Sequence, residues 1–189
     1  MKKQIDFYFD VVSPYSYVAS TLIEDVAQRC NADLLWNPIL LGGIFKAVGT
    51  SDAPGLTPAK KPYMLKDLQR LSRHYGIPLQ MPPDFPVRTV LVMRALSGLP
   101  PEQIPQAAHT LFNAYWADNL DIADPEVVAS LIGQEAVERA GMHEVKDALF
   151  KNTEEAVKRG AFGAPTFFVE DEMFFGHDRL HLLESHLRG

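Results

Sequence analysis

Segments with the pattern of β-strands occur only near the two ends of this chain, which limits the folds that it can adopt. Residues 5–9 alternate so that Ile, Phe and Phe share one face, and residues 34–41 form a largely apolar run interrupted at Pro38. Residues 166–169 and 173–175 flank Glu-Asp-Glu, a pattern typical of a β-hairpin. More than 100 residues between these end segments have no strand signal. We therefore expect one sheet built from both ends of the chain, with a helical block inserted in its middle.

The first strand segment leads directly into a helix. Ser13 precedes Pro14, and serine is favoured as an N-cap while proline is favoured at the first helical position. Val18, Leu22 and Val26 follow at helical spacing, which predicts a helix of about four turns. Strand, helix and strand within about 40 residues predict a parallel βαβ unit.

The order of elements predicts the fold class. Helices are expected from about Thr57, Val87, Ile104 and Asp124, with one or two more between Gln134 and Arg159 and a last one from about Arg179 to Leu187. The order βαβ, helical block, ββα is that of an α/β thioredoxin-like fold with an all-helical insertion. Residues 1–43 and 160–189 are expected to form the discontinuous thioredoxin-like domain, and residues 44–159 the inserted helical domain.

Composition excludes several classes of function. The formal net charge of −6 disfavours a non-specific hold on nucleic acid. No segment approaches the roughly 20 apolar residues that span a bilayer, and the N-terminus lacks the apolar stretch of an export signal. The single cysteine, Cys30, excludes an internal disulfide and a cysteine-pair metal site. We expect a cytoplasmic protein that binds neither nucleic acid nor membrane.

The turn Ser13-Pro14-Tyr15-Ser16 is the first candidate site. In thioredoxin-like redox proteins this turn carries C-x-x-C, because backbone N–H groups and the helix dipole stabilise a thiolate there. Serine occupies both cysteine positions here, so disulfide exchange through this turn is impossible. A serine hydroxyl can still donate to a thiolate brought by a ligand. The alternative is that Ser13 only caps the helix.

Two segments near the C-terminus are further candidates. Ala164-Pro165 comes just before the third strand segment, where thioredoxin-like proteins place a cis-proline, so we expect a cis peptide bond. The segment 176–179 closes the hairpin, and its backbone N–H groups and charged side chains could bind an amino-acid-like ligand or simply cap the last helix. His177 and His181 lack a third ligand nearby in sequence, so we expect no metal site.

These segments together resemble 2-hydroxychromene-2-carboxylate isomerases and the related kappa-class glutathione transferases over essentially the whole chain. The resemblance rests on D-x-x-S-P-Y-S at 10–16, Leu-Gly-Gly-Ile-Phe-Lys at 41–46, Lys60 with Tyr63, Phe85-Pro86, residues 160–165 and residues 176–179. It implies that glutathione is the cofactor. It further implies that Ser13 holds the sulfur, that Ala164 with Pro165 pairs with the cysteinyl backbone, that Lys60 lies near the glycyl carboxylate, and that Gly176, His177, Asp178 and Arg179 bind the glutamyl end.

The resemblance also implies a reaction and a substrate class. Addition of the glutathione thiolate would open the ring of an aromatic hemiketal acid, allow rotation about a single bond, and be reversed to restore the alkene. The expected substrate residues are Asn37, Phe45, Thr50, Tyr63, Phe85 and Arg88, of which Asn37 and Thr50 depart from the pattern of related sequences. Relatives imply a homodimer. The alternatives are a glutathione transferase that releases a stable conjugate, and a non-enzymatic peptide-binding or chaperone module.

Overall fold

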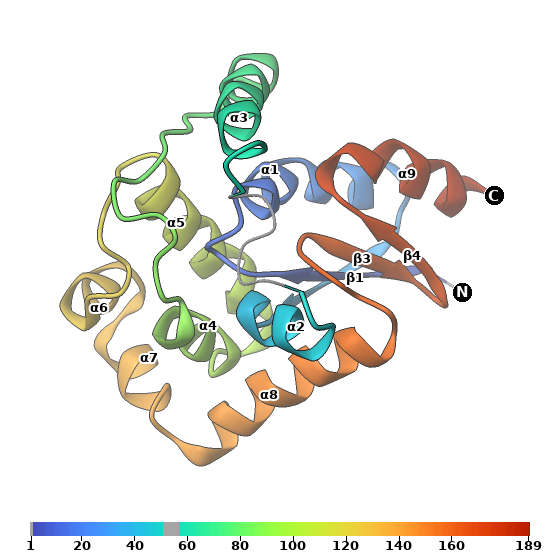
Figure 1. Cartoon of the computed structure of the whole chain (residues 1–189). Coiled ribbons are helices and arrows are strands. Elements are labelled where there is room, and N and C mark those ends of the chain that lie inside the picture. Colours follow the sequence, from blue (N-terminus) through green and yellow to red (C-terminus); the bar gives the residue numbers. More distant parts are fainter. Residues whose placement is uncertain (1, 51–56) are drawn as a thin grey trace.

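The computed structural model describes residues 2–50 and 57–189, and in this part of the chain four strands form one sheet (Figure 1). The strands are β1 (Gln4–Phe9), β2 (Asp33–Pro38), β3 (Thr166–Val169) and β4 (Glu172–Phe175). Their spatial order is β2-β1-β3-β4, with β1 parallel to β2 and antiparallel to β3. The expected sheet from both ends of the chain is therefore confirmed.

Helices cover both faces of this sheet. They are α1 (Pro14–Arg29), α2 (Leu41–Ala47), α3 (Lys61–Tyr75), α4 (Val90–Ser97), α5 (Ile104–Trp116), α6 (Pro125–Ile132), α7 (Gln134–Arg139), α8 (His143–Lys158) and α9 (Leu180–Arg188). In Figure 1, α1 and α9 lie on one face of the sheet, α2 and α8 lie on the other, α4 to α7 lie beyond one edge, and α3 lies above the start of α1. None of the helices in the described residues is long and apolar enough to cross a membrane.

The structure corrects three expected boundaries. The strand expected over residues 34–41 ends at Pro38, and α2 begins at Leu41. The backbone N–H of Leu41 donates to the Asp10 carboxylate at 2.9 Å, and such a contact with a distant residue is not visible in local sequence. The helices expected from Thr57 and Val87 begin instead at Lys61 and Val90.

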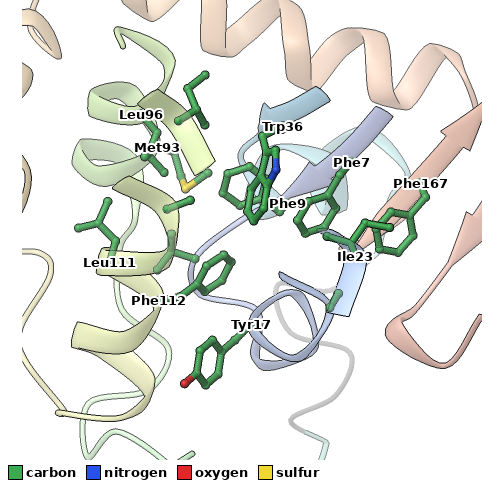
Figure 2. Packing of buried hydrophobic residues seen from close by; sticks show 14 of the residues in the cluster. Phe7, Phe9, Tyr17, Ile23, Trp36, Met93, Leu96, Leu111, Phe112 and Phe167 are labelled. Atoms are coloured by element: carbon green, nitrogen blue, oxygen red, sulfur yellow. The ribbon is translucent and has the colours of Figure 1, made fainter. Parts of the chain in front are cut away.

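One hydrophobic core joins the sheet to the inserted helices (Figure 2). The Phe7 ring on β1 lies 4.9 Å from the rings of Trp36 on β2 and Phe167 on β3. The Phe9 ring lies 5.7 Å from Phe112 on α5. Because these rings form one buried cluster, burial of apolar surface, the main force in folding, couples the two parts of the chain.

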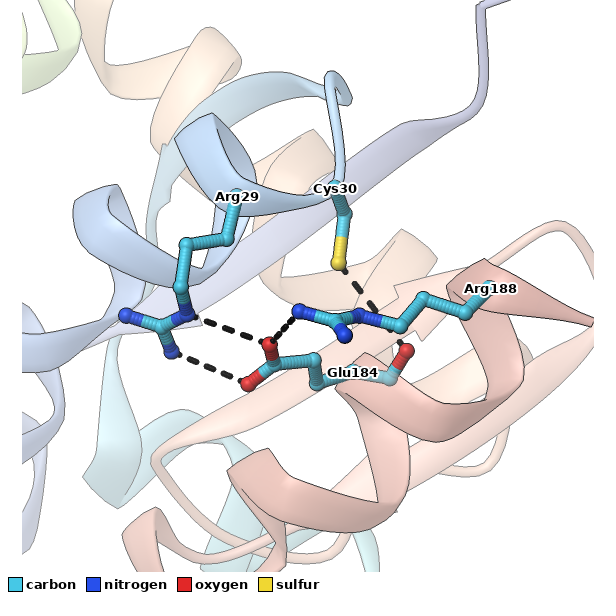
Figure 3. Close-up of polar contacts among 4 residues, drawn as sticks. All are labelled: Arg29, Cys30, Glu184 and Arg188. Carbon is cyan, nitrogen blue, oxygen red and sulfur yellow. Dashed lines mark hydrogen bonds and ion pairs between the residues drawn. The ribbon is translucent and has the colours of Figure 1, made fainter.

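Polar contacts dock α9 against α1 (Figure 3). The Arg29 guanidinium donates twice to the Glu184 carboxylate, at 3.1 and 2.9 Å, and Arg188 pairs with the same carboxylate. Hydrogen bonding to Arg29 lowers the pKa of Glu184. The half-buried Cys30 thiol faces the Glu184 backbone carbonyl with an S···O distance of 3.9 Å.

Candidate active site

Ser13 lies at the N-terminus of α1, where its hydroxyl oxygen serves two partners. It accepts the backbone N–H of Ser16 at 3.1 Å, as an N-cap does, and it donates to the backbone carbonyl of Ala164 at 3.0 Å. The residue is only 4% exposed. The structure therefore shows the helix cap, and it also joins the cap to the loop that precedes β3.

The Ala164–Pro165 peptide bond is cis, which confirms the expectation for this position. The loop is held on both sides, because the Thr166 hydroxyl donates to the Gly163 carbonyl at 2.8 Å and the Gly176 N–H donates to the Pro165 carbonyl at 3.0 Å. The Ala164 carbonyl is thereby fixed against the turn that begins α1.

Ser13 and Ala164 lie in the wall of a cavity of about 820 Å³. Most of the lining residues are apolar, and they come from the turn before α1, from α2 and the residues beside it, from the start of α3, from the segment that leads into α4, from the loop before β3 and from β4. Among the residues expected to bind glutathione or substrate, the structure brings together Ser13, Phe45, Thr50, Lys60, Phe85, Arg88 and Ala164. A pocket of this size and apolar character is typical of a site for a small organic ligand.

Several expected site residues lie outside this wall. Asn37 is half-buried on β2, where its side-chain amide faces the carbonyl of Leu35. Tyr63 is 62% exposed, and its ring lies 5.9 Å from the guanidinium of Arg70. Pro165 does not line the cavity, although it follows the lining residue Ala164 directly.

Residues 176–179 also lie outside the main cavity. They form a 3₁₀ turn (His177–Arg179) before α9. His177 and Asp178 line a smaller hollow of about 240 Å³ with residues of α1 and α9. The His177 ring stacks on Tyr15 with 5.5 Å between ring centroids. Since Tyr15 lines the main cavity, the two hollows meet at this stacked pair.

Burial changes the acid–base properties of the stacked pair. It lowers the pKa of His177 from 6.5, although Asp178 and Asp67 oppose this shift. Burial, with a smaller contribution from Asp67, raises the pKa of Tyr15 to about 12. Both side chains are therefore neutral near pH 7, so the wall between the hollows carries no charge from this pair.

Asp10 is a buried carboxyl group in the cavity wall. It opens the D-x-x-S-P-Y-S motif, but it was not among the expected site residues. It is 1% exposed and accepts backbone N–H groups from Val12 at 3.1 Å and from Leu41 at 2.9 Å. Burial raises its pKa, while these hydrogen bonds and one from Thr89 oppose the rise. Asp10 thus connects three segments of the wall. Its position three residues before Ser13 was the available sequence signal.

An exposed aromatic pair in the wall was also missed. Phe162 and Phe175 are 47% and 40% exposed, and their ring centroids are 4.5 Å apart. Both rings line the cavity, and a Cβ atom at Gly163 would lie 2.9 Å from the Phe175 ring. Their sequence signal is weak, because nothing local distinguishes these phenylalanines from core residues.

The charged groups of the wall do not form a metal site. Within residues 2–50 and 57–189, no three His, Cys, Asp or Glu side chains are grouped as metal ligands would be. The described wall instead combines a helix N-terminus, a hydroxyl donor and the cations Lys60 and Arg88. This combination suits an anionic organic ligand better than a metal ion.

Comparison with known proteins identifies the family. Residues 4–188 match the family described as DSBA-like thioredoxin domain. Glutathione S-transferase kappa 1 of Homo sapiens is 32% identical, covering 100% of this chain and 92% of that protein. The 2-hydroxychromene-2-carboxylate isomerase of Pseudomonas putida is 32% identical, and the match covers 96% of this chain and 92% of that protein. A solved structure of a 2-hydroxychromene-2-carboxylate isomerase has a TM-score of 0.83 at 29% identity, covering 98% of this chain and 94% of that chain. The chain therefore belongs to the DSBA-like thioredoxin family, in the group formed by 2-hydroxychromene-2-carboxylate isomerases and kappa-class glutathione transferases.

Proposed function

We propose that this protein is a glutathione-dependent cis-trans isomerase of 2-hydroxychromene-2-carboxylate or a similar intermediate of aromatic degradation. The observation that supports it most is the buried Ser13 hydroxyl at the N-terminus of α1, opposite Ala164 in a largely apolar cavity. The relatives named above as isomerases and glutathione transferases support the same class of chemistry. A cytoplasmic location and a homodimer belong to the proposal as well.

The residues of the site fit glutathione. The N-terminus of α1 and the Ser13 hydroxyl favour an anion at this point, so a thiol bound there would ionise more readily. In the main cavity, Lys60 would supply a cation for the glycyl carboxylate and Ala164 would supply backbone for the cysteinyl group, next to Pro165. Residues 176–179, of which His177 and Asp178 line the smaller hollow, would hold the glutamyl end. Bound glutathione would supply a thiolate that adds reversibly to the conjugated substrate.

The Ser13 hydroxyl carries a single proton, and this sets a condition on binding. In the structure that proton goes to the Ala164 carbonyl, while a lone pair of the same oxygen accepts the Ser16 N–H. To donate to a bound sulfur, the hydroxyl must turn away from Ala164. The carbonyl is then available to accept the cysteinyl N–H, so the two contacts with glutathione support each other.

The proposal can be tested by measuring turnover with glutathione at a concentration well below that of the substrate. The enzyme would be incubated with 2-hydroxychromene-2-carboxylate while product and free thiol are followed together. We expect many turnovers at constant free thiol, because the thiolate leaves after the bond has rotated. Consumption of thiol with a stable conjugate would make the protein a transferase. Peptide binding that is indifferent to glutathione, without turnover, would favour the non-enzymatic alternative.

Ser13→Ala tests the role of the hydroxyl. Loss of a donor to a reacting anion costs roughly 10²–10³-fold in rate, so we expect a loss in that range, together with loss of the thiolate absorbance that glutathione shows in the wild type. Ser20→Ala is the matched control, because Ser20 lies in the same helix, is buried, and bonds to the Tyr17 carbonyl outside the cavity. Full activity and a full thiolate signal in Ser13→Ala would show that Ser13 serves only as a helix cap.

A further inference from the structure

Arg88 and Lys60 are the two cations of the described cavity wall, and neither forms an ion pair with another described residue. The described wall also contains one carboxyl group, Asp10. Asp10 is almost completely buried and already accepts two backbone N–H groups. In the described part of the chain, no carboxylate forms an ion pair with Arg88, whose side chain is exposed.

The segment that carries Arg88 is fixed in place. Phe85 to Val90 all line the cavity. The Phe85 ring packs 5.5 Å from Trp116, whose indole N–H donates to the Val11 carbonyl at 2.8 Å. On the other side of Arg88, Thr89 is 6% exposed at the start of α4. The backbone of Arg88 is thus anchored beside the turn that leads to Ser13, although its side chain is exposed.

The rest of the wall offers a surface for a flat apolar body. Phe162 and Phe175 present two adjacent rings to the cavity, and Phe45 and Phe85 add two more aromatic residues to its lining. A ligand that fills such a pocket needs an apolar ring system. An arginine at the wall adds a planar donor that binds a carboxylate through two parallel hydrogen bonds.

We propose that Arg88 is the specificity-determining residue that binds the carboxylate of a planar aromatic acid beside the Ser13 site. This inference rests on the proposed function and extends it, because it states how the site would select an anionic substrate over a neutral electrophile. Lys60 is left for the carboxylate of glutathione. A neutral electrophile of the same shape lacks the carboxylate, so Arg88 does not increase its affinity.

Binding of coumarin-3-carboxylate and of neutral coumarin tests this inference without turnover. The two probes share one planar bicycle and differ in the carboxylate. Titration calorimetry with the glutathione-saturated protein should show tighter binding of the acid. Because hydrogen bonds to a charged group are worth about 1.5–3 kcal/mol, Arg88→Gln should weaken the binding of coumarin-3-carboxylate by roughly tenfold or more. The affinities for coumarin and for glutathione should stay within about twofold of the wild type, since neither depends on Arg88.

Two further variants complete the test. Arg88→Lys should recover part of the affinity for the acid, because it keeps the charge and loses the paired geometry. Arg73→Gln removes the same charge from an exposed position of α3 outside the cavity and should change none of these affinities.

An equal loss of glutathione and acid affinity in Arg88→Gln would assign Arg88 to the glutathione site and overturn the inference. So would a wild-type protein that shows no preference for the acid. A preference that depends on Arg88 in a protein that does not isomerise the chromene acid would uphold the inference and refute only the proposed reaction.

Discussion

His177 is a histidine buried in neutral form, and its effect on stability depends on pH. It is 9% exposed, and its ring stacks on Tyr15 with only 7° between the ring planes. Burial lowers its pKa in the folded protein below 6.5. The unfolded chain therefore takes up a proton first as the pH falls, so folded-state stability is fully present above 6.5 and is lost below it.

His177→Phe should make stability less dependent on pH. The phenylalanine keeps an aromatic ring against Tyr15 and removes the proton-binding site. One proton changes the free energy of unfolding by at most about 1.4 kcal/mol per pH unit, and urea unfolding at several pH values below 6.5 should show a shallower loss in the variant. His143→Gln is the control, because the His143 side chain is 89% exposed and should leave the profile unchanged. Parallel profiles for wild type and His177→Phe would contradict this account of His177.

At the scale of elements, the N-terminus of α1 is a local anion site. The Ser16 N–H points at the atom in the γ position of residue 13, and the helix dipole adds partial positive charge there. Glutathione is not needed to test this property, since a cysteine side chain can supply the anion.

Ser13→Cys, made in a Cys30→Ala background, should have a thiol pKa below about 7.5, as cysteines at helix N-termini do. Thiolate absorbance near 240 nm against pH measures it directly. Ser20→Cys in the same background is the matched control, because residue 20 lies within the helix, where backbone N–H groups are already bonded. Its pKa should lie at or above the ordinary value of about 8.5. Equal pKa values for the two thiols would show that the helix start does not stabilise anions.

Arg159 connects the end of α8 to the sheet. Its guanidinium donates to the Asp6 carboxylate at 2.7 Å and to the Glu170 carbonyl at 2.8 Å, and it lies 3.9 Å from the Phe168 ring centroid. Lysine cannot reproduce both hydrogen bonds and the stacked contact at once.

Arg159→Lys should therefore lower the free energy of unfolding by about 1–3 kcal/mol, the range for losing hydrogen bonds to a partly buried charge. Denaturant unfolding measures the change. Arg188→Lys should cost much less, because Arg188 is 59% exposed and exposed ion pairs contribute little. Similar losses in the two variants would show that the Arg159 contacts add no stability.

The elements and site residues that the sequence predicted are those with local signals. Periodic apolar positions predicted α1 and α5, and the serine–proline turn placed Ser13 at a helix start. The start of α2 was missed because Asp10 and Thr153, which are distant in sequence, accept the N–H groups of Leu41 and Leu40. Phe162 was missed for a related reason, since its place in the cavity wall depends on several segments that are distant in sequence.

At the scale of the whole molecule, the core decides whether the chain unfolds in one step. Phe112 on α5 packs against Phe9 on β1 and against Tyr17 on α1. Phe112→Ala should lower the free energy of unfolding by about 3–5 kcal/mol. The transition should remain single, because the ring is part of the cluster that both halves of the chain share.

Two probes can check this single transition. Tryptophan fluorescence reports on Trp36 in β2 and Trp116 in α5, and circular dichroism reports on all helices. For each protein, wild type or variant, we expect the unfolding curve from fluorescence to coincide with the curve from circular dichroism. Phe150→Ala is the control, because Phe150 is 66% exposed on α8 and should change stability little. Two separate transitions would instead support independent folding of the predicted domains 1–43 with 160–189 and 44–159.

The pairing of β1 with β3 has a consequence for folding during synthesis on the ribosome. β1 and β2 can pair early in synthesis, but Phe7 also lies opposite Phe167, which is translated far later. At about 5–20 residues per second, the nascent chain carries an incomplete sheet for roughly 10–30 s. During that interval the edge of β1 that pairs with β3 has no partner strand in the chain, although Phe7 can already pack against Trp36 on β2, and such an open edge is a target for chaperones and for aggregation. Slower translation of the central helical region would lengthen this exposure, so we expect the yield of this protein in cells to depend on elongation speed as well as on the stability of the finished fold.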